Sequence, residues 1–182
     1  MAEKELQILE GCRRGDAKAQ AQLYHTFKST LFAICRRYAS NEQEAEDWLQ
    51  DGFIRIYQDL YQYKPTGSLK AWMRKVTLNI CLKHIRSKKK LFPVLDLERV
   101  AEKLEMPTTP EEDPQEALVP ILQQLPEGYR AVINLYVIEA YSHKEIGEFL
   151  GITESSSRSQ LTRAKKFMRQ LIEKKRTKNI VK

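Results

Sequence analysis

Polar side chains suited to reading DNA lie close together near the carboxyl end of the chain. They are short hydroxyl side chains mixed with cations: Ser155, Ser156, Arg158, Ser159, Thr162, Arg163 and Lys166. Short hydroxyl side chains let a helix backbone approach DNA closely, and an arginine can bind guanine O6 and N7 with two hydrogen bonds. This pattern predicts the exposed side of a helix that enters the major groove.

A second group of polar residues repeats at helical spacing in the first half of the chain. Its members are an aromatic residue, an amide and three cations: Trp72, Lys75, Asn79, Lys83 and Arg86. Residues 70 to 92 hold eight basic side chains and no acidic one. Aromatic rings stack on bases while cations contact phosphates, so this stripe predicts a second nucleic-acid surface.

Acidic residues are concentrated just before that stripe. Residues 41 to 60 contain six acids and one base, and Glu44, Asp47 and Asp51 share one helical face. A face of this charge repels DNA and suits a different, basic partner.

The sequence gives no sign of catalysis, a metal or a cofactor. The histidines are scattered, at positions 25, 84 and 143, and Cys81 with His84 lacks the further ligands that a zinc site needs. There is no glycine-rich phosphate loop. The three cysteines are far apart and odd in number, which favours reduced, buried thiols. We therefore expect a protein that is not an enzyme.

Charge and proline divide the 182 residues into three parts. Residues 1–92 carry a net charge of +7, residues 93–120 carry −6 and residues 121–182 carry +6. Five of the seven prolines fall between positions 93 and 120. We expect two basic helical domains, 1–92 and 115–182, joined by a flexible, acidic, proline-rich linker, 93–114. The amino terminus lacks a signal-peptide pattern and no window is apolar enough to span a bilayer, so a cytoplasmic protein is expected.

Helical periodicity accounts for both domains, and no strand alternation is evident. Apolar stripes predict helices over residues 16–39 and 42–60, and Asn41 and Ser68 are candidate N-caps for the second and third helices. The inward residues are Ala45, Leu49, Phe53, Ile56 and Leu60 on the second helix and Leu69, Met73, Val76 and Ile80 on the third. In the second domain Pro126 can begin a helix, with Val132, Ile133, Tyr136 and Val137 facing inward.

The carboxyl-terminal domain also carries the signature of a helix-turn-helix. Ser142 and Glu145 form a predicted capping box, and Gly151 ends the short helix that follows. Thr153 can cap a further helix running to about Lys174, with Leu161, Ala164, Met168 and Leu171 as its inner stripe. Two helices joined by a short turn containing glycine have the spacing of a helix-turn-helix. The bases from Lys165 onward would add salt-dependent phosphate binding.

Five segments, taken in order, resemble the sigma-70 family of bacterial RNA polymerase initiation factors, in particular its two-domain extracytoplasmic-function (ECF) group. They are Asp47–Tyr57, Trp72–Asn79 with Arg86, Leu125–Arg130, Tyr141–Gly147 and Arg158–Ala164. The resemblance covers nearly the whole chain and implies a sigma region 2-like bundle, a linker and a region 4-like helix-turn-helix.

The resemblance also implies a role for each surface. The helix over 42–60 would dock on the clamp helices of the polymerase largest subunit, through Glu44, Asp47, Trp48, Gln50, Asp51 and Arg55. The promoter −10 element would be bound and melted by Tyr61, Tyr63, Lys64, Trp72, Lys75, Asn79, Lys83 and Arg86. The −35 element would be read as duplex by Ser155, Ser156, Arg158, Ser159, Thr162, Arg163 and Lys166. The linker would follow the RNA exit path.

The implied function is therefore promoter-specific transcription initiation, with core RNA polymerase and promoter DNA as partners and no stable homo-oligomer. Members of this family are often held by an anti-sigma factor, although no residue here identifies one. Two alternatives stay open from the residues alone. A helix-turn-helix regulator would bind duplex DNA without polymerase, whereas a helical interaction protein would show no salt-dependent DNA binding.

Overall fold

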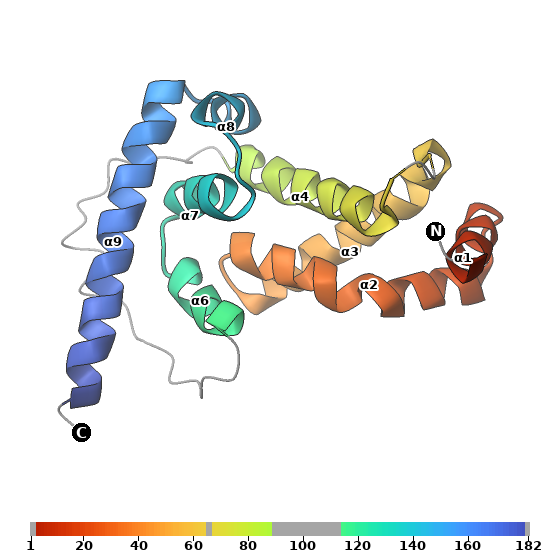
Figure 1. The fold of residues 1–182 in the computed structure, drawn as a ribbon, viewed down its shortest axis with the longest axis horizontal. Helices are drawn as coiled ribbons and strands as arrows, with labels where there is room; N and C mark the ends of the chain where they lie inside the picture. Colours follow the sequence, from red (N-terminus) through yellow and green to blue (C-terminus); the bar gives the residue numbers. More distant parts are fainter. Residues whose placement is uncertain (1–2, 65–66, 89–113, 181–182) are drawn as a thin grey trace. The chain divides into compact units, whose positions relative to one another are not determined.

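The computed structural model describes residues 3–64, 67–88 and 114–180, and every element within them is helical (Figure 1). The all-α prediction is thereby confirmed. The elements before residue 89 are α1 (Glu3–Arg13), α2 (Ala17–Tyr38), α3 (Glu42–Asp59), the 3-10 turn η1 (Leu60–Gln62) and α4 (Leu69–Ser87). The later elements are α6 (Pro114–Gln123), α7 (Glu127–Ile133), the π-helical turn η2 (Asn134–Ile138), α8 (His143–Leu150) and α9 (Glu154–Ile180).

The chain separates into two compact units. The first comprises Met1–Arg36 with Asn41–Lys83, and the second comprises Arg37–Ser40 with His84–Lys182. The expected linker falls almost entirely within residues 89–113, which lie outside the described residues. The side chains of the basic residues from Lys174 onward lie outside them as well.

The first unit is built on the apolar stripes of α2, α3 and α4. The predicted stripe of α3 is fully buried, at Ala45, Leu49, Phe53, Ile56 and Leu60. On α4 the prediction was only partly right, because Leu69 and Met73 are buried, whereas Val76 and Ile80 are half-buried and Leu78 and Cys81 are buried in their place.

Two helices of the first unit begin at the residues predicted to cap them. The Asn41 side chain accepts a hydrogen bond from the backbone N–H of Glu44 at 2.8 Å. The Ser68 hydroxyl accepts one from the N–H of Ala71 at 3.3 Å. Each bond satisfies an N–H that has no partner within its own helix. These caps fix where the exposed faces of α3 and α4 begin.

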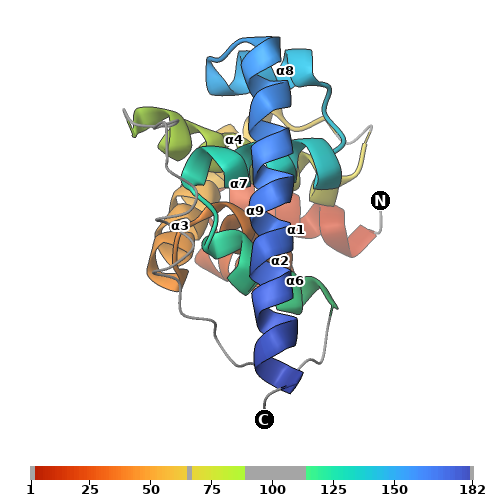
Figure 2. The same cartoon turned by 90° about the vertical axis from the view of Figure 1, so that its left-hand side faces the viewer.

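The second unit is organised along α9. Figures 1 and 2 show α9 as one long helix, with α8 beside its first turns and α7 and α6 packed along it. Its predicted inner stripe is buried at Leu161, Ala164 and Leu171, whereas Met168 is only half-buried and Phe167 is buried instead. The helix continues to Ile180, beyond the expected end near Lys174, because no glycine or proline interrupts it.

The segment after α7 departs from prediction. The backbone widens into the π-helical turn η2, which changes the angular phase of the side chains that follow. Val132 and Ile133 are buried as predicted, whereas Tyr136 and Val137 are exposed, Val137 by 58%. The inward assignment of Tyr136 and Val137 was therefore wrong. Helix α7 also begins one residue later than predicted, at Glu127, because Pro126 is its N-cap and not its first residue.

Candidate nucleic-acid and protein interfaces

The first turns of α9 present the predicted reading residues to solvent. Ser156 is half-buried, and the other six are exposed: Ser155, Arg158, Ser159, Thr162, Arg163 and Lys166. The Ser159 hydroxyl donates to the Ser155 carbonyl at 3.1 Å, and the Thr162 hydroxyl donates to the Arg158 carbonyl at 3.2 Å. These hydroxyl groups fold back on their own helix, so they keep the surface low enough for close approach to DNA.

Arg158 is paired within its own helix. Its guanidinium donates to the Glu154 carboxylate, one turn earlier. Both side chains are largely exposed, so the pair is weak. A base contact that uses Nη2 of Arg158 requires this pair to open.

The turn between α8 and α9 is set by local chemistry. The Ser142 hydroxyl accepts from the N–H of Glu145 while the Glu145 carboxylate accepts from the N–H of Ser142, which confirms the predicted capping box. The Ser142 hydroxyl also donates to the Glu145 carboxylate at 2.7 Å, and this bond and, next, the one from the Ser142 N–H hold the pKa of Glu145 below its ordinary value. Gly151 ends α8 in the left-handed conformation, with φ of 68°. The hydroxyl of Thr153 then caps α9 by accepting from the N–H of Ser156 at 3.0 Å.

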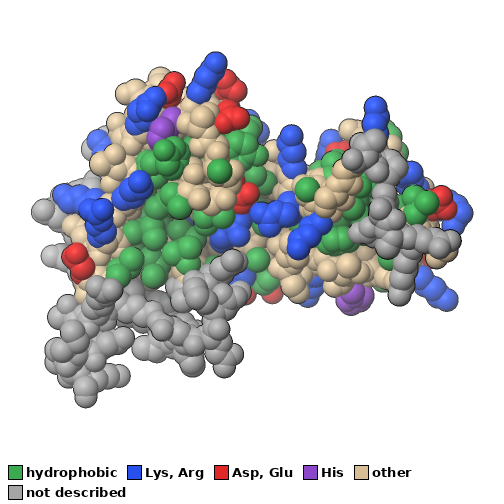
Figure 3. Space-filling view, viewed as in Figure 1, with side chains coloured by type: hydrophobic (Ala, Val, Ile, Leu, Met, Phe, Trp, Pro, Cys, Tyr) green, Lys and Arg blue, Asp and Glu red, His purple; other side chains and the backbone are tan. Residues whose placement is uncertain are grey.

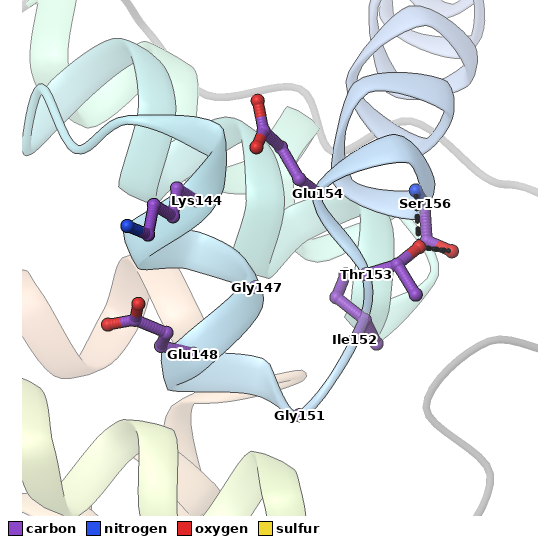
Figure 4. A pocket seen from close by; sticks show the side chains of 8 residues that line it. All are labelled: Lys144, Gly147, Glu148, Gly151, Ile152, Thr153, Glu154 and Ser156. Carbon is purple, nitrogen blue, oxygen red and sulfur yellow. Dashed lines mark hydrogen bonds between the residues drawn. The ribbon is translucent and has the colours of Figure 1, made fainter.

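The two helices approach so closely that Gly147 has no room for a side chain. A Cβ at this position would lie 2.7 Å from the carbonyl oxygen of Ile152, and that residue's N–H donates to the Gly147 carbonyl at 3.0 Å. A hollow of about 570 Å³ lies around this turn. Figure 4 shows three of its lining side chains, Lys144 and Glu148 on α8 and Glu154 at the start of α9. The close approach fixes the angle at which α9 leaves α8.

His143 connects the two helices from the buried side of α9, a role the sequence did not indicate. Its Nδ1 lies 2.9 Å from the hydroxyl of the buried Ser157, and its ring stacks on Tyr136 with centroids 4.5 Å apart. Burial and, next, the positive charge of Arg158 lower the pKa of His143. In the sequence, the signal for this contact was Ser157, a serine at a core position of α9 that needs a polar partner.

Basic side chains continue along α9 beyond the reading residues. Figure 3 shows Lys and Arg side chains gathered on the side of the second unit that α9 forms. Lys165, Lys166 and Arg169 are exposed, and the Lys165 ammonium lies 6.0 Å from the centre of the Tyr136 ring. Such cations suit contacts with the phosphate backbone on either side of a groove.

The stripe on α4 is arranged as predicted. Lys75, Asn79, Lys83 and Arg86 are exposed, and Trp72 is half-buried. The Trp72 ring packs against Tyr63, with centroids 5.5 Å apart. Since one side of the indole is engaged by the protein, it can offer a supported surface for a stacked base.

The turn before α4 exposes one tyrosine and buries another. Tyr61 is 73% exposed and Lys64 is exposed, whereas Tyr63 is only 4% exposed. The Tyr63 hydroxyl donates to the Gly67 carbonyl at 2.6 Å. The structure thus places Tyr63 inside the turn, where it supports the neighbouring residues.

The acidic face of α3 ends at an exposed apolar residue. Asp47, Gln50 and Asp51 are exposed and Glu44 is half-buried, while Ile54 is 55% exposed within the same face. The sequence analysis missed Ile54, although it falls outside the buried stripe and so is an apolar residue with no place in the core.

The other two α3 residues predicted to bind the polymerase, Trp48 and Arg55, differ from the residues of the acidic face. Trp48 is buried, at 3% exposure, so its ring belongs to the core of the first unit. Arg55 is exposed and pairs with Asp59 one turn later at 2.6 Å.

Within the described residues, no three histidine, cysteine or acidic side chains are placed to hold a metal ion. None of the described helices has the length and apolarity required to cross a bilayer. Cys35 and Cys81 are buried with sulfur atoms 4.0 Å apart.

A short capped helix, a tight glycine turn and a second helix with an exposed polar start define a helix-turn-helix DNA-binding unit. Family models match both halves of the chain. The model described as Sigma-70 region 2 matches residues 23–91, and the one described as Sigma-70, region 4 matches residues 115–168.

Similar proteins support the same assignment. The ECF RNA polymerase sigma factor SigW of Bacillus subtilis (strain 168) is 31% identical over 170 residues, covering 86% of this chain and 90% of SigW. The RNA polymerase sigma-H factor of Pseudomonas aeruginosa is 25% identical over 175 residues, covering 90% of this chain and 91% of that factor. The chain belongs to the sigma-70 family, in its ECF group, and sigma factors are transcription initiation factors rather than enzymes.

A solved structure has the same fold. It is the sigma factor RpoE of Bartonella quintana, crystallised in complex with the anti-sigma factor NepR. The TM-score is 0.51 at 18% identity, covering 84% of this chain and 96% of that chain. This likeness shows the fold alone.

Proposed function

We propose that this chain binds core RNA polymerase as an ECF sigma factor and directs transcription initiation at promoters with specific −10 and −35 elements. The observation that carries the proposal is the presence, on one chain, of two basic surfaces suited to DNA and one acidic face suited to a protein. The domain limits that go with it are 1–92, 93–114 and 115–182.

The face of α3 is proposed to dock on the polymerase. Asp47 and Asp51 supply negative charge, and the exposed Ile54, less than one turn after Asp51, supplies an apolar contact. Interfaces with a desolvated centre and a charged rim draw much of their energy from the centre. The matching partner is a basic surface that contains an apolar position.

The −10 element is proposed to bind along the turn and stripe of the first unit. Tyr61 and the supported ring of Trp72 would stack on displaced bases, while Lys75 and Lys83 would contact phosphates. Tyr63 contributes by holding the turn, since its side chain is buried.

The −35 element is proposed to bind as duplex against the start of α9. Arg158 and Arg163 are the residues placed to read base edges, and Lys166 is placed for a phosphate contact. A regulator acting without polymerase would account for the region 4 match at 115–168 but leave the region 2 match at 23–91 unexplained.

The protein is proposed to act in the cytoplasm, where the polymerase is, and as a monomer. An anti-sigma partner is part of the proposal, because the similar Bartonella RpoE was crystallised with the anti-sigma factor NepR.

The test is run-off transcription with the cognate core polymerase on a pool of promoter fragments. Specific transcripts are expected only when the protein is added. Asp47→Lys should abolish them by reversing the charge of the docking face, and Ile54→Ala should weaken them. Glu46→Lys is the matched control, since Glu46 is the exposed neighbour of Asp47 and points away from that face.

Equal loss in the Asp47 and Glu46 variants would contradict the docking face. Transcription that never depends on the protein, together with tight duplex binding by the protein alone, would support the regulator instead.

A further inference from the structure

Arg13 bonds to the turn that carries Tyr61. It is the last residue of α1, and its Nη2 donates to the carbonyl oxygen of Tyr63 at 2.8 Å. The same guanidinium donates to the carbonyl oxygen of Leu60, at 3.4 Å from Nε and 3.3 Å from Nη2. One side chain therefore joins both ends of the turn Leu60–Lys64, across about 50 residues of sequence.

These carbonyl groups lie where helical hydrogen bonding runs out. At the end of a helix the last carbonyl oxygens have no N–H partner in the helix and need another donor. The Leu60 carbonyl accepts from the N–H of Tyr63 at 3.3 Å, a long bond, and the guanidinium adds a charged donor. Arg13 thus supplies the bonding that α3 and η1 cannot.

The helix that carries Arg13 is held against the first unit. Leu9 is 1% exposed and Cys12 is 6% exposed, and α1 contacts η1. Because the preceding turn is buried, the guanidinium extends from a fixed base, so it can hold the turn in one place.

A hydrogen bond within the turn also orients the Tyr61 side chain. The Gln62 amide donates to the Tyr61 hydroxyl at 3.0 Å and to the Asp59 carboxylate at 3.3 Å. The exposed ring is therefore oriented from its outer end by a neighbour, while Arg13 fixes the backbone beneath it.

We propose that Arg13 is a positioning residue for the −10 site: it locks the turn Leu60–Lys64 so that Tyr61 meets the displaced DNA strand in a prepared conformation. This inference rests on the proposed function of the first unit. A turn that is already ordered loses less conformational entropy when a base stacks on it, so capture is tighter. The amino-terminal helix thereby acts on promoter opening without touching DNA.

Hydrogen exchange of the Leu60–Lys64 amides in the free full-length protein tests the lock. Arg13→Ala should speed their exchange about tenfold, because charge-assisted hydrogen bonds to the carbonyl groups are lost. Arg13→Lys should restore part of the protection. Arg14→Ala, which removes the same charge from an exposed neighbour, should leave exchange unchanged. Unchanged exchange in Arg13→Ala would overturn the proposal.

A thermodynamic cycle tests the link to DNA. Binding of the polymerase holoenzyme to a forked promoter is measured with an intact −10 strand and with an abasic nucleotide at each −10 position in turn. For wild type, the abasic position that weakens binding most marks the captured base. Arg13→Ala should weaken binding to the intact fork about tenfold and to that abasic fork by much less.

Each outcome has a separate meaning. An equal loss on both forks would mean that Arg13→Ala only lowers the active fraction of protein, and the positioning role would be refuted. A wild-type holoenzyme insensitive to every abasic position would instead refute base capture by the first unit, whatever hydrogen exchange shows for the turn.

Discussion

Replacing Gly147 with valine should disrupt the helix-turn-helix far more than helix propensity predicts. Glycine in a helix interior costs up to about 1 kcal/mol relative to alanine, so on propensity alone this position invites substitution. The structure gives a reason for the glycine, since a Cβ would lie 2.7 Å from the Ile152 carbonyl oxygen.

The size of the effect follows from that distance. Ordinary contact begins near 3.4 Å, so α8 and the turn must separate by about 0.7 Å for any side chain to fit. Alanine places its Cβ at the same point against backbone, so the clash offsets the gain of up to about 1 kcal/mol from its better propensity. Valine adds two methyl groups at the same point, and overpacking of this kind costs about 1 to 3 kcal/mol. We expect a net loss of about 2 kcal/mol for valine.

The assay is hydrogen exchange of the α8 and α9 amides in the full-length protein, with duplex binding to a −35 element alongside. A loss of about 2 kcal/mol corresponds to about 30-fold faster exchange where opening is limited by the stability of this unit. Glu148→Val is the matched control, because it places the same β-branched residue one position later on an exposed surface.

The comparison of the two valine variants decides the matter. If Gly147→Val and Glu148→Val were equally protected and bound DNA equally well, the close approach at Ile152 would not constrain the turn. The explanation for the glycine would then be wrong.

Three further predictions concern pH and DNA opening. Because burial and Arg158 lower the pKa of His143 from 6.5, the unfolded chain takes up the proton first, so the second unit should lose stability as pH falls below about 6.5. Denaturation with pH should show this slope in wild type, and His143→Gln should flatten it. Burial, then Cys12 and Tyr24, raises the pKa of Tyr57 from 10 to about 12, so the first unit should lose stability between about pH 10 and 12. Tyr57→Phe should remove that loss in alkaline denaturation curves, and an unchanged curve would contradict it. Melting about 12 base-pair steps costs roughly 17 kcal/mol, whereas stacking returns about 1 to 3 kcal/mol per captured base, so the protein without polymerase should leave −10 thymines unreactive to permanganate.

Features set by local chemistry were predictable from the sequence. The caps at Asn41, Ser142 and Thr153 and the left-handed end of α8 at Gly151 were all named in advance. Each depends on a few neighbouring residues, so the sequence carries the information directly. The exposed arrangement of the α9 reading residues followed from their spacing alone.

Features set by distant contacts or by helix phase were not predictable. The π-helical turn η2 shifted Tyr136 and Val137 to the surface, and no residue type marks where such a turn will form. The burial of Tyr63 depends on α4 packing beside its turn, and the role of Arg13 depends on α1 reaching η1. Neither contact has a sequence signal, because the partners are separated along the chain.

The pairing of Arg158 with Glu154 bears on how the second unit rejects wrong DNA. An exposed ion pair of this kind is worth up to about 1 kcal/mol, and a site that takes Nη2 of Arg158 must offset that. Guanine offers two acceptors and returns about 1 to 3 kcal/mol, whereas a base edge with a single acceptor returns little after the pair has opened. Glu154 therefore acts as an internal competitor for its own reading residue. If Arg158 reads the −35 element as proposed, weak sites on bulk DNA would leave it on Glu154, and only a good match would draw it away.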